Sequence, residues 1–597
     1  MPQLISSTGP LTDLTGILYG SDFEDIHAPW RRLFSSEEYS FREGLTTEER
    51  IRVSYDRLRQ VNSTVADPLA LASNMPSLTA LHGWAGVADG GMTTLASIHY
   101  NLFLGSLLDH GYDGDLTEFT SMRRIGTFLC TEVAHGNDAA SLETTATFDR
   151  STGGFVLNTP NPGACKFMPN TSSVGGAKSA LVAARLLVDG TDHGIYLFLT
   201  PLTDSDGHHL PGVEVHRIPE TVGSHVDHCT TAFHDLPLPF NALLQSDHGR
   251  LTRDGVFTST LGSPRKRFLR SIARVTAGKL CMASGSLGLT RYALAVAMRY
   301  AHSRRTSGMT SAGRVPLIAH RSHHAPLLSA VATAYAATVL LRSVVQRCAL
   351  TSEFDGEGTE RLIAMAKAWI TWQGRAVMTE CRERCGAQGL LLANGIAGQI
   401  ATNEGTITAE GDNRVIWVKA AGETLSGGFA PRALDDRDPA TCSLQDSRHL
   451  QDLLADLERI RYDDSRSRLR RGRHPSPLAR WNATVSPAMD LVDAHVHRLA
   501  AEALLAATGE AESSLGRQLL TDLHGLFAVE FIRAHGGELL AHGRLTTEQF
   551  LGLRDTTDRL IDRLQPHALL LTDGFAVPDD ILNSRPILHG ITISHDE

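Results

Sequence analysis

The spacing of apolar residues changes twice along this chain, and that change constrains the fold more than any other feature. From about residue 36 to 128 apolar residues recur at helical spacing, and in TTEERIRVSYDRLRQV the pair Thr46 and Glu49 forms a capping box. Between about residues 131 and 261, short β-branched and aromatic runs such as GIYLFLTPL alternate with Gly, Pro, Asn and Asp. This texture is typical of strands joined by turns. The sequence therefore begins with helices and continues into a β domain.

Helical patterns return after Arg265. The first is FLRSIARVTAGKLCMASGSLGLTRYALAVAMRYAHSRR, and others follow in HAPLLSAVATAYAATVLLRSVVQRCALTSE and from about Glu360 to Arg382. Their broad apolar faces are typical of core helices in a bundle. A stretch rich in Pro, Asp and Arg, residues 432–477, precedes the last helical region, so we place a domain junction there.

The sequence thus predicts an α+β multidomain fold. We expect an N-terminal helical domain over residues 1–128, a central antiparallel β domain over 129–264, a helical bundle over 265–440 and a second C-terminal helical domain over 441–597. A chain of 597 residues is longer than one typical domain of roughly 100–200 residues, which agrees with several cores.

Charge and terminal sequences limit the partners and the location. The 56 basic and 66 acidic residues give a net charge of −10, which argues against nucleic acid as a partner. The start, MPQLISSTGPLTDLTG, lacks a basic segment followed by an apolar core, and no stretch approaches ~18 uninterrupted apolar residues. The end, ITISHDE, is unlike the Ser-Lys-Leu peroxisomal address. We expect a cytoplasmic protein without a membrane span.

Two glycine-containing segments offer polar contacts to a ligand. In LCTEVAHGND, residues 129–138, a turn exposes backbone amides and Thr131 adds a hydroxyl, which together could hydrogen-bond a planar heterocycle with polar edges. In CRERCGAQGLLLANG, residues 381–395, Gly386 and Gly389 follow a helix and permit close approach to a ligand. An ordinary turn and an ordinary helix ending explain the same residues equally well.

The segment TAEGDNRVIW, residues 408–417, holds a candidate general base. A carboxylate at Glu410, followed by Gly411 and an apolar helix, can lie in a partly dehydrated pocket where it becomes a useful base. The alternative is a helix start at which acidic residues favour the helix dipole.

Metal and hydrolase chemistry find little support in the sequence. Cys381 and Cys385 lie one helical turn apart without a matching Cys/His pair, and the histidines of AHRSHHAP have no third ligand. The chain has no GxSxG motif in a strand-turn-helix context, so a Ser-His-Asp hydrolase is not supported. We predict no metal site.

The motifs, their order and the chain length resemble the acyl-CoA oxidase branch of the acyl-CoA dehydrogenase superfamily. The resemblance covers most of the chain and is strongest over residues 89–413. It is carried by CTEVAHGN with SLETTATFD, by RIPETVGSHVDHCTTAFHDLPLPFNALL, by RYAHSRR, and by CRERCGAQG with AEGDN. It implies helical, β and helical-bundle domains, to which oxidases add a second C-terminal helical domain.

The resemblance also implies flavin adenine dinucleotide (FAD) between the β domain and the bundle, in a homodimer whose subunits help hold each other's cofactor. Thr131 matches the residue that contacts the isoalloxazine ring, and Gly136 and Asn137 belong to the same turn. Arg305 matches a basic residue that reaches the cofactor's diphosphate. The turn GAQG, which contains Gly386, Gln388 and Gly389, also approaches the cofactor.

Glu410 matches the family's catalytic base. The implied reaction removes the α-proton of an acyl thioester by Glu410 while a hydride leaves the β-carbon for the flavin, which gives a trans-2-enoyl thioester. Oxygen then reoxidises the flavin and yields hydrogen peroxide. The substrates implied are O2 and an acyl-CoA or acyl carrier protein thioester, of unspecified chain length.

Three segments depart from the family's pattern. The aromatic-Pro-Gly-Gly segment reads KFMPNTSSVGG, with Asn170 near the place of a flavin-contacting glycine. A glutamine-rich helix of the family reads RSHHAP here, and its Gly-Gly-His-Gly turn reads GAQG.

Two alternative functions follow: a dehydrogenase that uses a protein electron acceptor, and a non-catalytic partner subunit without flavin. The long C-terminal region favours the oxidase, and Glu410 argues against the partner subunit. It also argues against a third option, amine hydroxylation on this fold.

Overall fold

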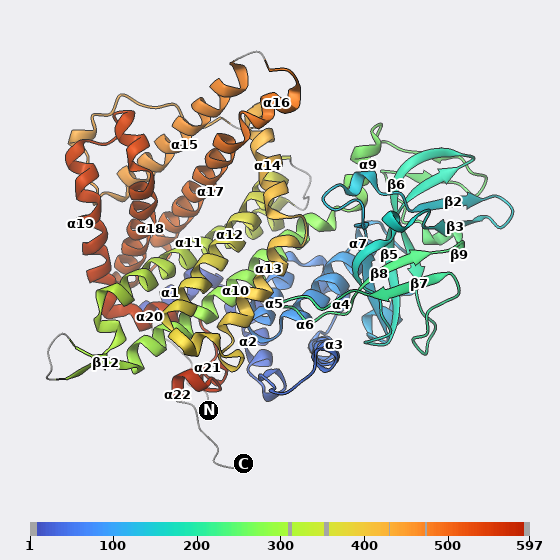
Figure 1. Ribbon diagram of the computed structural model, residues 1–597, viewed down its shortest axis with the longest axis horizontal. Coiled ribbons are helices and arrows are strands. Elements are labelled where there is room, and N and C mark those ends of the chain that lie inside the picture. The colour runs from blue at the N-terminus through green and yellow to red at the C-terminus, as the bar shows by residue number, and fades with distance from the viewer. Residues whose placement is uncertain (1–8, 309–312, 352–356, 429, 472–473, 590–597) are drawn as a thin grey trace, which may run out of the picture. The chain divides into compact units, whose positions relative to one another are not determined.

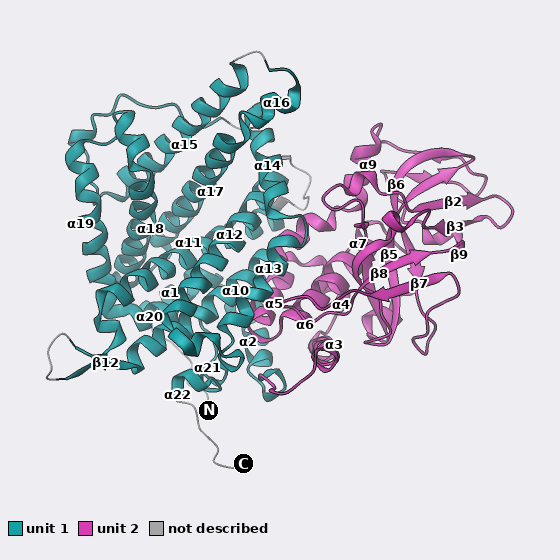
Figure 2. Cartoon of the chain, viewed as in Figure 1, with its two compact units in different colours: residues 1–40, 282–597 teal, residues 41–281 magenta. Residues whose placement is uncertain are grey.

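The computed structural model describes residues 9–308, 313–351, 357–428, 430–471 and 474–589. The C-terminal sequence ITISHDE and the first eight residues, on which part of the expected location rests, lie outside this set. The described chain forms two compact units (Figure 2). Unit 1 contains residues up to 40 and from 282 onward, and unit 2 contains residues 41–281.

Unit 2 opens with a group of helices. The predicted capping box starts the first of them, since the Thr46 hydroxyl accepts from the Glu49 amide at 3.3 Å and the Glu49 carboxylate accepts from the Thr46 amide at 2.8 Å. A π-helical segment, Ser97–Leu104, joins α6 to α7. The helices are α3 (Thr47–Thr64), α4 (Pro68–Ser73), α5 (Met75–Ala88), α6 (Gly90–Ala96), α7 (Gly105–Asp109) and α8 (Thr117–Thr120).

A six-stranded sheet forms the centre of the β domain. Both β1 and β2 pair in parallel with one edge of β5, β1 along its first half and β2 along its second, while β6 pairs antiparallel with β5. The expected β domain is confirmed, but this sheet is mixed rather than antiparallel throughout, because the long strand β5 accepts two strands of its own direction. The strands are β1 (Arg124–Leu129), β2 (Thr145–Asp149), β3 (Gly154–Asn158), β5 (Ala177–Val188), β6 (Thr191–Pro201) and β9 (Leu236–Leu238).

A second, antiparallel sheet has the order β4-β8-β7, and a two-stranded ribbon pairs β10 with β11. The core of the domain includes Val182 and Leu186 of β5 and Phe198 of β6, all fully buried. A strand as buried as β5 reads as a nearly continuous apolar run, here ALVAARLLV, which only the half-buried Arg185 interrupts. The remaining elements are β4 (Lys166–Asn170), β7 (Val213–Arg217), β8 (His228–Phe233), β10 (Arg250–Leu251), β11 (Phe257–Thr258) and the helix α9 (Pro264–Ser271).

Unit 1 is helical, apart from a hairpin of β12 (Arg305–Ser307) and β13 (Arg314–Pro316). Helix α11 packs against α12, α17 and α18, and α15 packs against α17 and α18 (Figure 1). The longer helices are α10 (Arg274–Ser303, starting in unit 2), α11 (Arg321–Thr351), α12 (Glu357–Arg384), α13 (Ile396–Thr408), α14 (Asn413–Glu423), α15 (Ser447–Arg470), α17 (Val485–Ala507), α18 (Ser514–Ala541) and α19 (Thr547–Leu564). The shorter ones are α1 (Pro10–Tyr19), α2 (Ala28–Phe34), α16 (Pro477–Asn482), α20 (Ala568–Asp573), α21 (Asp579–Asn583) and α22 (Pro586–His589).

The first helices of the chain join the C-terminal part of unit 1. The Asp13 carboxylate accepts from the amides of Glu512 and Ser513 at 3.0 and 2.9 Å, just before α18. The Tyr19 hydroxyl donates to the Phe575 carbonyl at 2.6 Å. The sequence places these helices in one domain with residues 41–128, whereas in the structure they belong to the same unit as the last helices. The α+β multidomain fold is confirmed, and the domain boundaries stay predictions.

Helices α10 and α11 are long and apolar enough to cross a membrane by length and composition alone. Their most apolar windows are 100% and 78% buried within the protein, respectively. Packing in a helical core accounts for an apolar composition of this kind equally well.

Candidate active site

Glu410 lies in the turn between α13 and α14. Its backbone is left-handed, with a φ of 59°, and Gly411 continues the turn at a φ of 100°. A Cβ at Gly411 would lie 2.9 Å from the Cγ2 atom of Ile416, so the position requires glycine. Asp412 is the N-cap of α14 and accepts from the Arg414 amide at 3.0 Å. Asp412, rather than Glu410, is therefore the acidic residue that caps the start of the helix. The Glu410 side chain is partly buried.

The glycine turn after α12 forms a short 3₁₀ helix. Gly386 is left-handed, with a φ of 56°, which is the usual glycine ending of a helix. A Cβ at Gly389 would lie 2.5 Å from the Arg382 carbonyl oxygen. Gln388 accepts from the Asn394 side chain at its backbone carbonyl, 2.9 Å, and at Oε1, 3.1 Å. The helix ending accounts for both glycines, and a cofactor contact at this turn stays a prediction.

Arg305 is exposed on the hairpin of β12 and β13. Its guanidinium donates to the Arg314 carbonyl at 3.1 Å, and Arg314 donates in return to the Arg305 carbonyl at 3.1 Å. Figure 1 shows β12 at one end of unit 1, well apart from the region of α13 and α14. The structure therefore does not bring Arg305 next to Glu410 within one chain.

In unit 2, the turn after β1 carries Thr131, Gly136 and Asn137 in exposed positions. The Thr131 carbonyl accepts from the Phe167 amide at 2.9 Å, which ties the start of the turn to β4. Asn137 is left-handed, with a φ of 58°. Among the described residues, nothing would lie within 4 Å of a Cβ at Gly136. Asn137 therefore shapes this turn, and Gly136 leaves space beside it.

A buried ion pair holds the same turn to the β domain. Glu132, next to Thr131 in sequence, accepts from the Lys166 ammonium at 2.9 Å, the Thr144 hydroxyl at 2.6 Å and the Glu143 amide at 2.7 Å. Lys166 also donates to the Ala183 carbonyl at 2.8 Å. Both charged side chains are fully buried. This pair was not predicted from the sequence, although a lysine that opens the strand KFMPN was a visible signal.

Asn170, at the end of β4, is fully buried and faces inward. Its amide nitrogen donates to the Tyr55 hydroxyl at 3.1 Å, and its oxygen accepts from the Thr127 hydroxyl. Tyr55 donates to Asp227 at 2.6 Å, and Asp227 also accepts from the Lys178 ammonium at 2.7 Å. The Asn170 side chain is thus part of a buried polar cluster, so a ligand contact here would fall to its backbone.

The predicted site residues divide between the two units. Unit 2 contains the exposed turn with Thr131, Gly136 and Asn137, and the buried position Asn170. Unit 1 contains the candidate base, the helix ending and the hairpin arginine, namely Glu410, Gly386, Gln388, Gly389 and Arg305.

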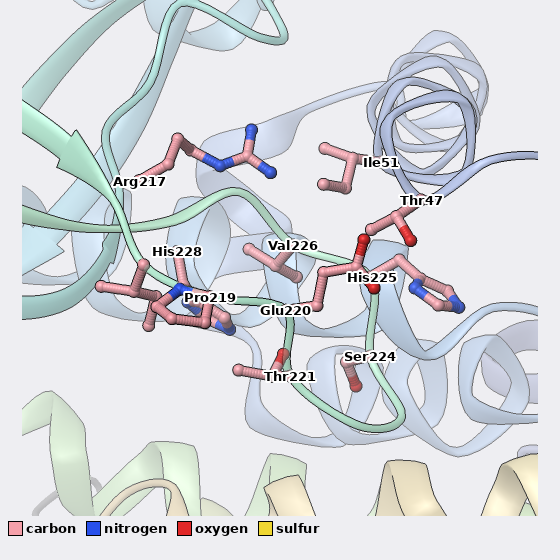
Figure 3. A pocket seen from close by; sticks show the side chains of 11 residues that line it. Thr47, Ile51, Arg217, Pro219, Glu220, Thr221, Ser224, His225, Val226 and His228 are labelled. Atoms are coloured by element: carbon pink, nitrogen blue, oxygen red, sulfur yellow. The ribbon is translucent and has the colours of Figure 1, made fainter.

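A small pocket lies in unit 2 between α3 and the loop that follows β7. Figure 3 shows Thr47 and Ile51 of α3 facing the loop that carries Glu220 and His225, and Arg217 also lines the pocket. The loop is the segment RIPETVGSHVDH, one of those that carry the family resemblance. No pocket was predicted for this loop from the sequence.

One group of possible metal ligands occurs among the described residues. Ligand atoms of Asp204, Asp206 and His208 lie within 4.8 Å of one another in a largely exposed turn. The Asp204 carboxylate accepts from the amides of Asp206 and His208, at 2.9 Å each, so turn formation accounts for its presence. The histidines 320, 323 and 324 do not form such a group.

Two family descriptions match this chain. Residues 273–425 match "Acyl-CoA oxidase, C-alpha1 domain", and residues 461–585 match "Acyl-CoA oxidase". Acyl-coenzyme A oxidase 2, peroxisomal, of Arabidopsis thaliana is 26% identical over 547 residues, which cover 83% of this chain and 77% of the relative. The acyl-coenzyme A oxidase-like protein of Mus musculus is 26% identical over 536 residues, covering 82% and 83%. These matches all support the acyl-CoA oxidase family.

Solved structures of acyl-CoA oxidases share the fold of this chain. Acyl-CoA oxidase 1 of Yarrowia lipolytica superposes with a TM-score of 0.85 at 21% identity, over 97% of this chain and 89% of the other. Acyl-CoA oxidase 1 of Caenorhabditis elegans, complexed with FAD and ATP, gives a TM-score of 0.83 at 21% identity, over 98% and 92%. At this identity the likeness shows the acyl-CoA oxidase fold.

Proposed function

We propose that this chain is a flavin-dependent acyl-CoA oxidase, which converts an acyl thioester to its trans-2-enoyl thioester while oxygen is reduced to hydrogen peroxide. The observation that carries the proposal is Glu410. The residue that the resemblance matches to the catalytic base is partly buried and lies in a left-handed turn that the adjacent glycine and the N-cap of α14 define.

Glu410 would take the α-proton of the thioester onto its carboxylate. A fixed turn suits this task because proton abstraction requires the carboxylate within hydrogen-bond reach of the reacting carbon. The developing negative charge on the thioester oxygen needs a donor, and the resemblance assigns the Glu410 backbone amide to that role. One such donor is typically worth about 3–4 kcal/mol of barrier.

The donor chemistry of the candidate residues fits FAD. Thr131 offers an exposed hydroxyl, Asn137 an exposed amide and Arg305 an exposed guanidinium, which suit the carbonyl edges of a flavin ring and a diphosphate. When bound, FAD would accept the hydride from the β-carbon and pass both electrons to oxygen. Thr131 and Asn137 would hold the ring edge, and Arg305 the diphosphate.

We also propose a homodimer. The separation of Arg305 from Glu410 within one chain supports it, because the resemblance implies that the bundle of one subunit helps hold the neighbouring subunit's cofactor. The names of the relatives support a coenzyme A thioester rather than an acyl carrier protein thioester. The cytoplasmic location stays a prediction, and several relatives are named peroxisomal.

A second candidate function is a partner subunit without flavin. The inward-facing side chain of Asn170 favours it, because the altered segment KFMPNTSSVGG uses its polar group inside the β domain. The candidate base favours the oxidase, since proton abstraction requires a carboxylate at that place.

The visible spectrum of the purified chain separates these functions. An oxidase should be yellow, bleach on addition of acyl-CoA without air and recover on exposure to oxygen, with one hydrogen peroxide formed for each enoyl-CoA. Bleaching followed by recovery only with an added electron acceptor would indicate a dehydrogenase. A colourless protein that FAD does not reconstitute would indicate the partner subunit.

A further inference from the structure

Lys367 is a fully buried lysine in the helical bundle. It stands in the apolar run AMAKAWITW of α12, a place that would ordinarily hold an apolar side chain. Lysines are almost never fully buried unless the ammonium is bonded, because desolvation of an uncompensated charge is costly. The ammonium of Lys367 therefore depends on acceptors inside the protein.

Those acceptors belong to the segment that carries Glu410. The Lys367 ammonium donates to the Ile407 carbonyl at 2.9 Å, the Gly411 carbonyl at 3.0 Å and the Asn413 side-chain oxygen at 2.9 Å. An ammonium has three N–H donors, which matches three acceptors. One acceptor precedes Glu410 in α13, one follows it directly, and one begins α14. The lysine thus binds the backbone on both sides of the candidate base.

Asn413 ties the same segment to α12 a second time. Its amide nitrogen donates to the Ala368 carbonyl at 3.1 Å and to the Thr371 hydroxyl at 2.8 Å. The Thr371 carbonyl accepts from Asn403 of α13 at 3.0 Å, and Asn403 accepts from the Ser286 hydroxyl of α10 at 2.6 Å. Buried polar contacts therefore fix both helices that flank the turn.

The turn needs such support. Glu410 has a left-handed backbone, which costs a non-glycine residue about 1–3 kcal/mol and persists only where the surrounding structure enforces it. Ala409 and Gly411, its neighbours, are exposed, so apolar burial contributes little to holding the turn itself. The hydrogen bonds from Lys367 hold the chain on both sides of Glu410, at Ile407 before it and at Gly411 after it.

We propose that Lys367 is the positioning residue for Glu410, with its ammonium holding the left-handed turn so that the carboxylate keeps one place and direction. The inference rests on the proposed role of Glu410 as the base. Lys367 acts through the backbone of the turn, so its loss should slow proton abstraction more than it weakens substrate binding.

Hydrogen exchange of the purified full-length protein tests the structural half of the proposal. Lys367→Met retains an apolar stem and removes the ammonium, and amide exchange in peptides covering residues 405–416 should become at least about 10-fold faster. The control is Lys419→Met, because Lys419 also joins α14 to α12, through Glu360 at 2.8 Å, without bonding the turn. Exchange over residues 405–416 should stay unchanged in the control.

Steady-state kinetics test the functional half. In Lys367→Met, kcat for acyl-CoA should fall about 100-fold with little change in KM. Lys367→Gln, which keeps two N–H donors, should lie between the wild type and Lys367→Met in both exchange and kcat, and it carries the same test if Lys367→Met does not fold. Unchanged exchange and unchanged kcat in the Lys367 variants would overturn the proposal.

A double variant separates this proposal from the proposed function. If Lys367 acts through Glu410, adding Lys367→Met to Glu410→Gln should cause no further loss of turnover. A further loss of turnover in the double variant, as large as the loss in Lys367→Met alone, would show that Lys367 acts elsewhere and would overturn its positioning role. Full turnover in Glu410→Gln alone would instead reject Glu410 as the base, while faster exchange in Lys367→Met would still show that the lysine holds the turn.

Discussion

The Lys166 ammonium lies 2.9 Å from the Glu132 carboxylate, and both side chains are fully buried in the β domain. Burial alone would raise the pKa of Glu132, but the Lys166 charge and hydrogen bonds from Thr144 and the Glu143 amide outweigh it and hold that pKa below its ordinary value. The lowered pKa favours the ionised form of Glu132, while burial lowers the pKa of Lys166 and Glu132 opposes that shift. Each member compensates a charge that would otherwise be buried alone, directly beside the turn that carries Thr131.

Removing one member of this pair should destabilise the protein strongly. Lys166→Met leaves the Glu132 carboxylate buried without its cation, which typically costs about 3–5 kcal/mol. A lower midpoint of thermal unfolding would report the loss. Hydrogen exchange would then show whether the loss lies in the β strands. Lys166→Met combined with Glu132→Gln should be more stable than Lys166→Met alone, because no uncompensated charge remains. Equal stability of the single and double variants would contradict this account.

His497 should make the protein less stable in acid. Its ring lies between those of Phe527 and Phe531, at centroid distances of 4.1 and 3.8 Å, and burial lowers its pKa from 6.5 to about 3. Between those values the unfolded chain binds a proton at this residue and the folded protein does not. The free energy of unfolding should therefore fall by up to roughly 1.4 kcal/mol per pH unit as the pH drops through this range.

His497→Phe removes that proton-binding site while keeping an aromatic ring in the stack. The midpoint of thermal unfolding of His497→Phe, relative to the wild type, should rise progressively as the pH is lowered from 7 to 5. His208→Gln, which changes a histidine whose side chain is 80% exposed, serves as the control and should follow the wild type. Parallel curves for His497→Phe and the wild type would mean that this histidine is not linked to acid stability.

Glu410→Gln should retain the fold and bound flavin but lose most turnover. Loss of a general base typically lowers the rate by about 10²–10⁴-fold, because the amide cannot accept the α-proton. The measurement is flavin bleaching by acyl-CoA without air, in a stopped-flow spectrometer. Glu404→Gln, which removes a carboxylate of α13 that pairs with Arg375, should keep the wild-type rate. Wild-type bleaching by Glu410→Gln would remove Glu410 from the mechanism.

Thr131→Ala should weaken flavin binding and shift the visible spectrum. One hydrogen bond is worth roughly 0.5–1.5 kcal/mol, so the Kd of FAD should rise about 2- to 10-fold. Titration of the flavin-free protein with FAD gives both the affinity and the spectrum. Thr191→Ala, which removes another exposed hydroxyl of unit 2, should change neither. An unaltered spectrum and Kd in Thr131→Ala would place the flavin contact elsewhere.

Features that depend on neighbours in sequence were predictable. The capping box of Thr46 and Glu49 forms as expected, because both partners lie within one helical turn. The helix expected from about Glu360 to Arg382 is α12, since apolar spacing reports which face of a helix is buried. The family resemblance supplied the candidate site residues, and their roles stay predictions.

Features that depend on distant partners were not predictable. The sequence indicated a β domain, but the parallel pairing of β5 with β1 and β2 depends on the course of the chain between them. The family's motif put Asn170 near the place of a flavin-contacting glycine. Its side chain turns inward because Tyr55 and Thr127 offer buried hydrogen-bond partners. The buried ion pair of Lys166 with Glu132 was not predictable either, because it also depends on a partner that is distant in sequence.

The sequence by itself determined the alternation of helical and β regions, the capping box at Thr46 and the identity of a candidate base, because local periodicity and short motifs carry this information. Only the tertiary structure decided which groups compensate Lys367, a lysine in an otherwise apolar helix. A buried charge is stable only beside matching acceptors, and those come from helices that the chain reaches tens of residues later. The arrangement that fixes Glu410 is therefore a property of the folded bundle.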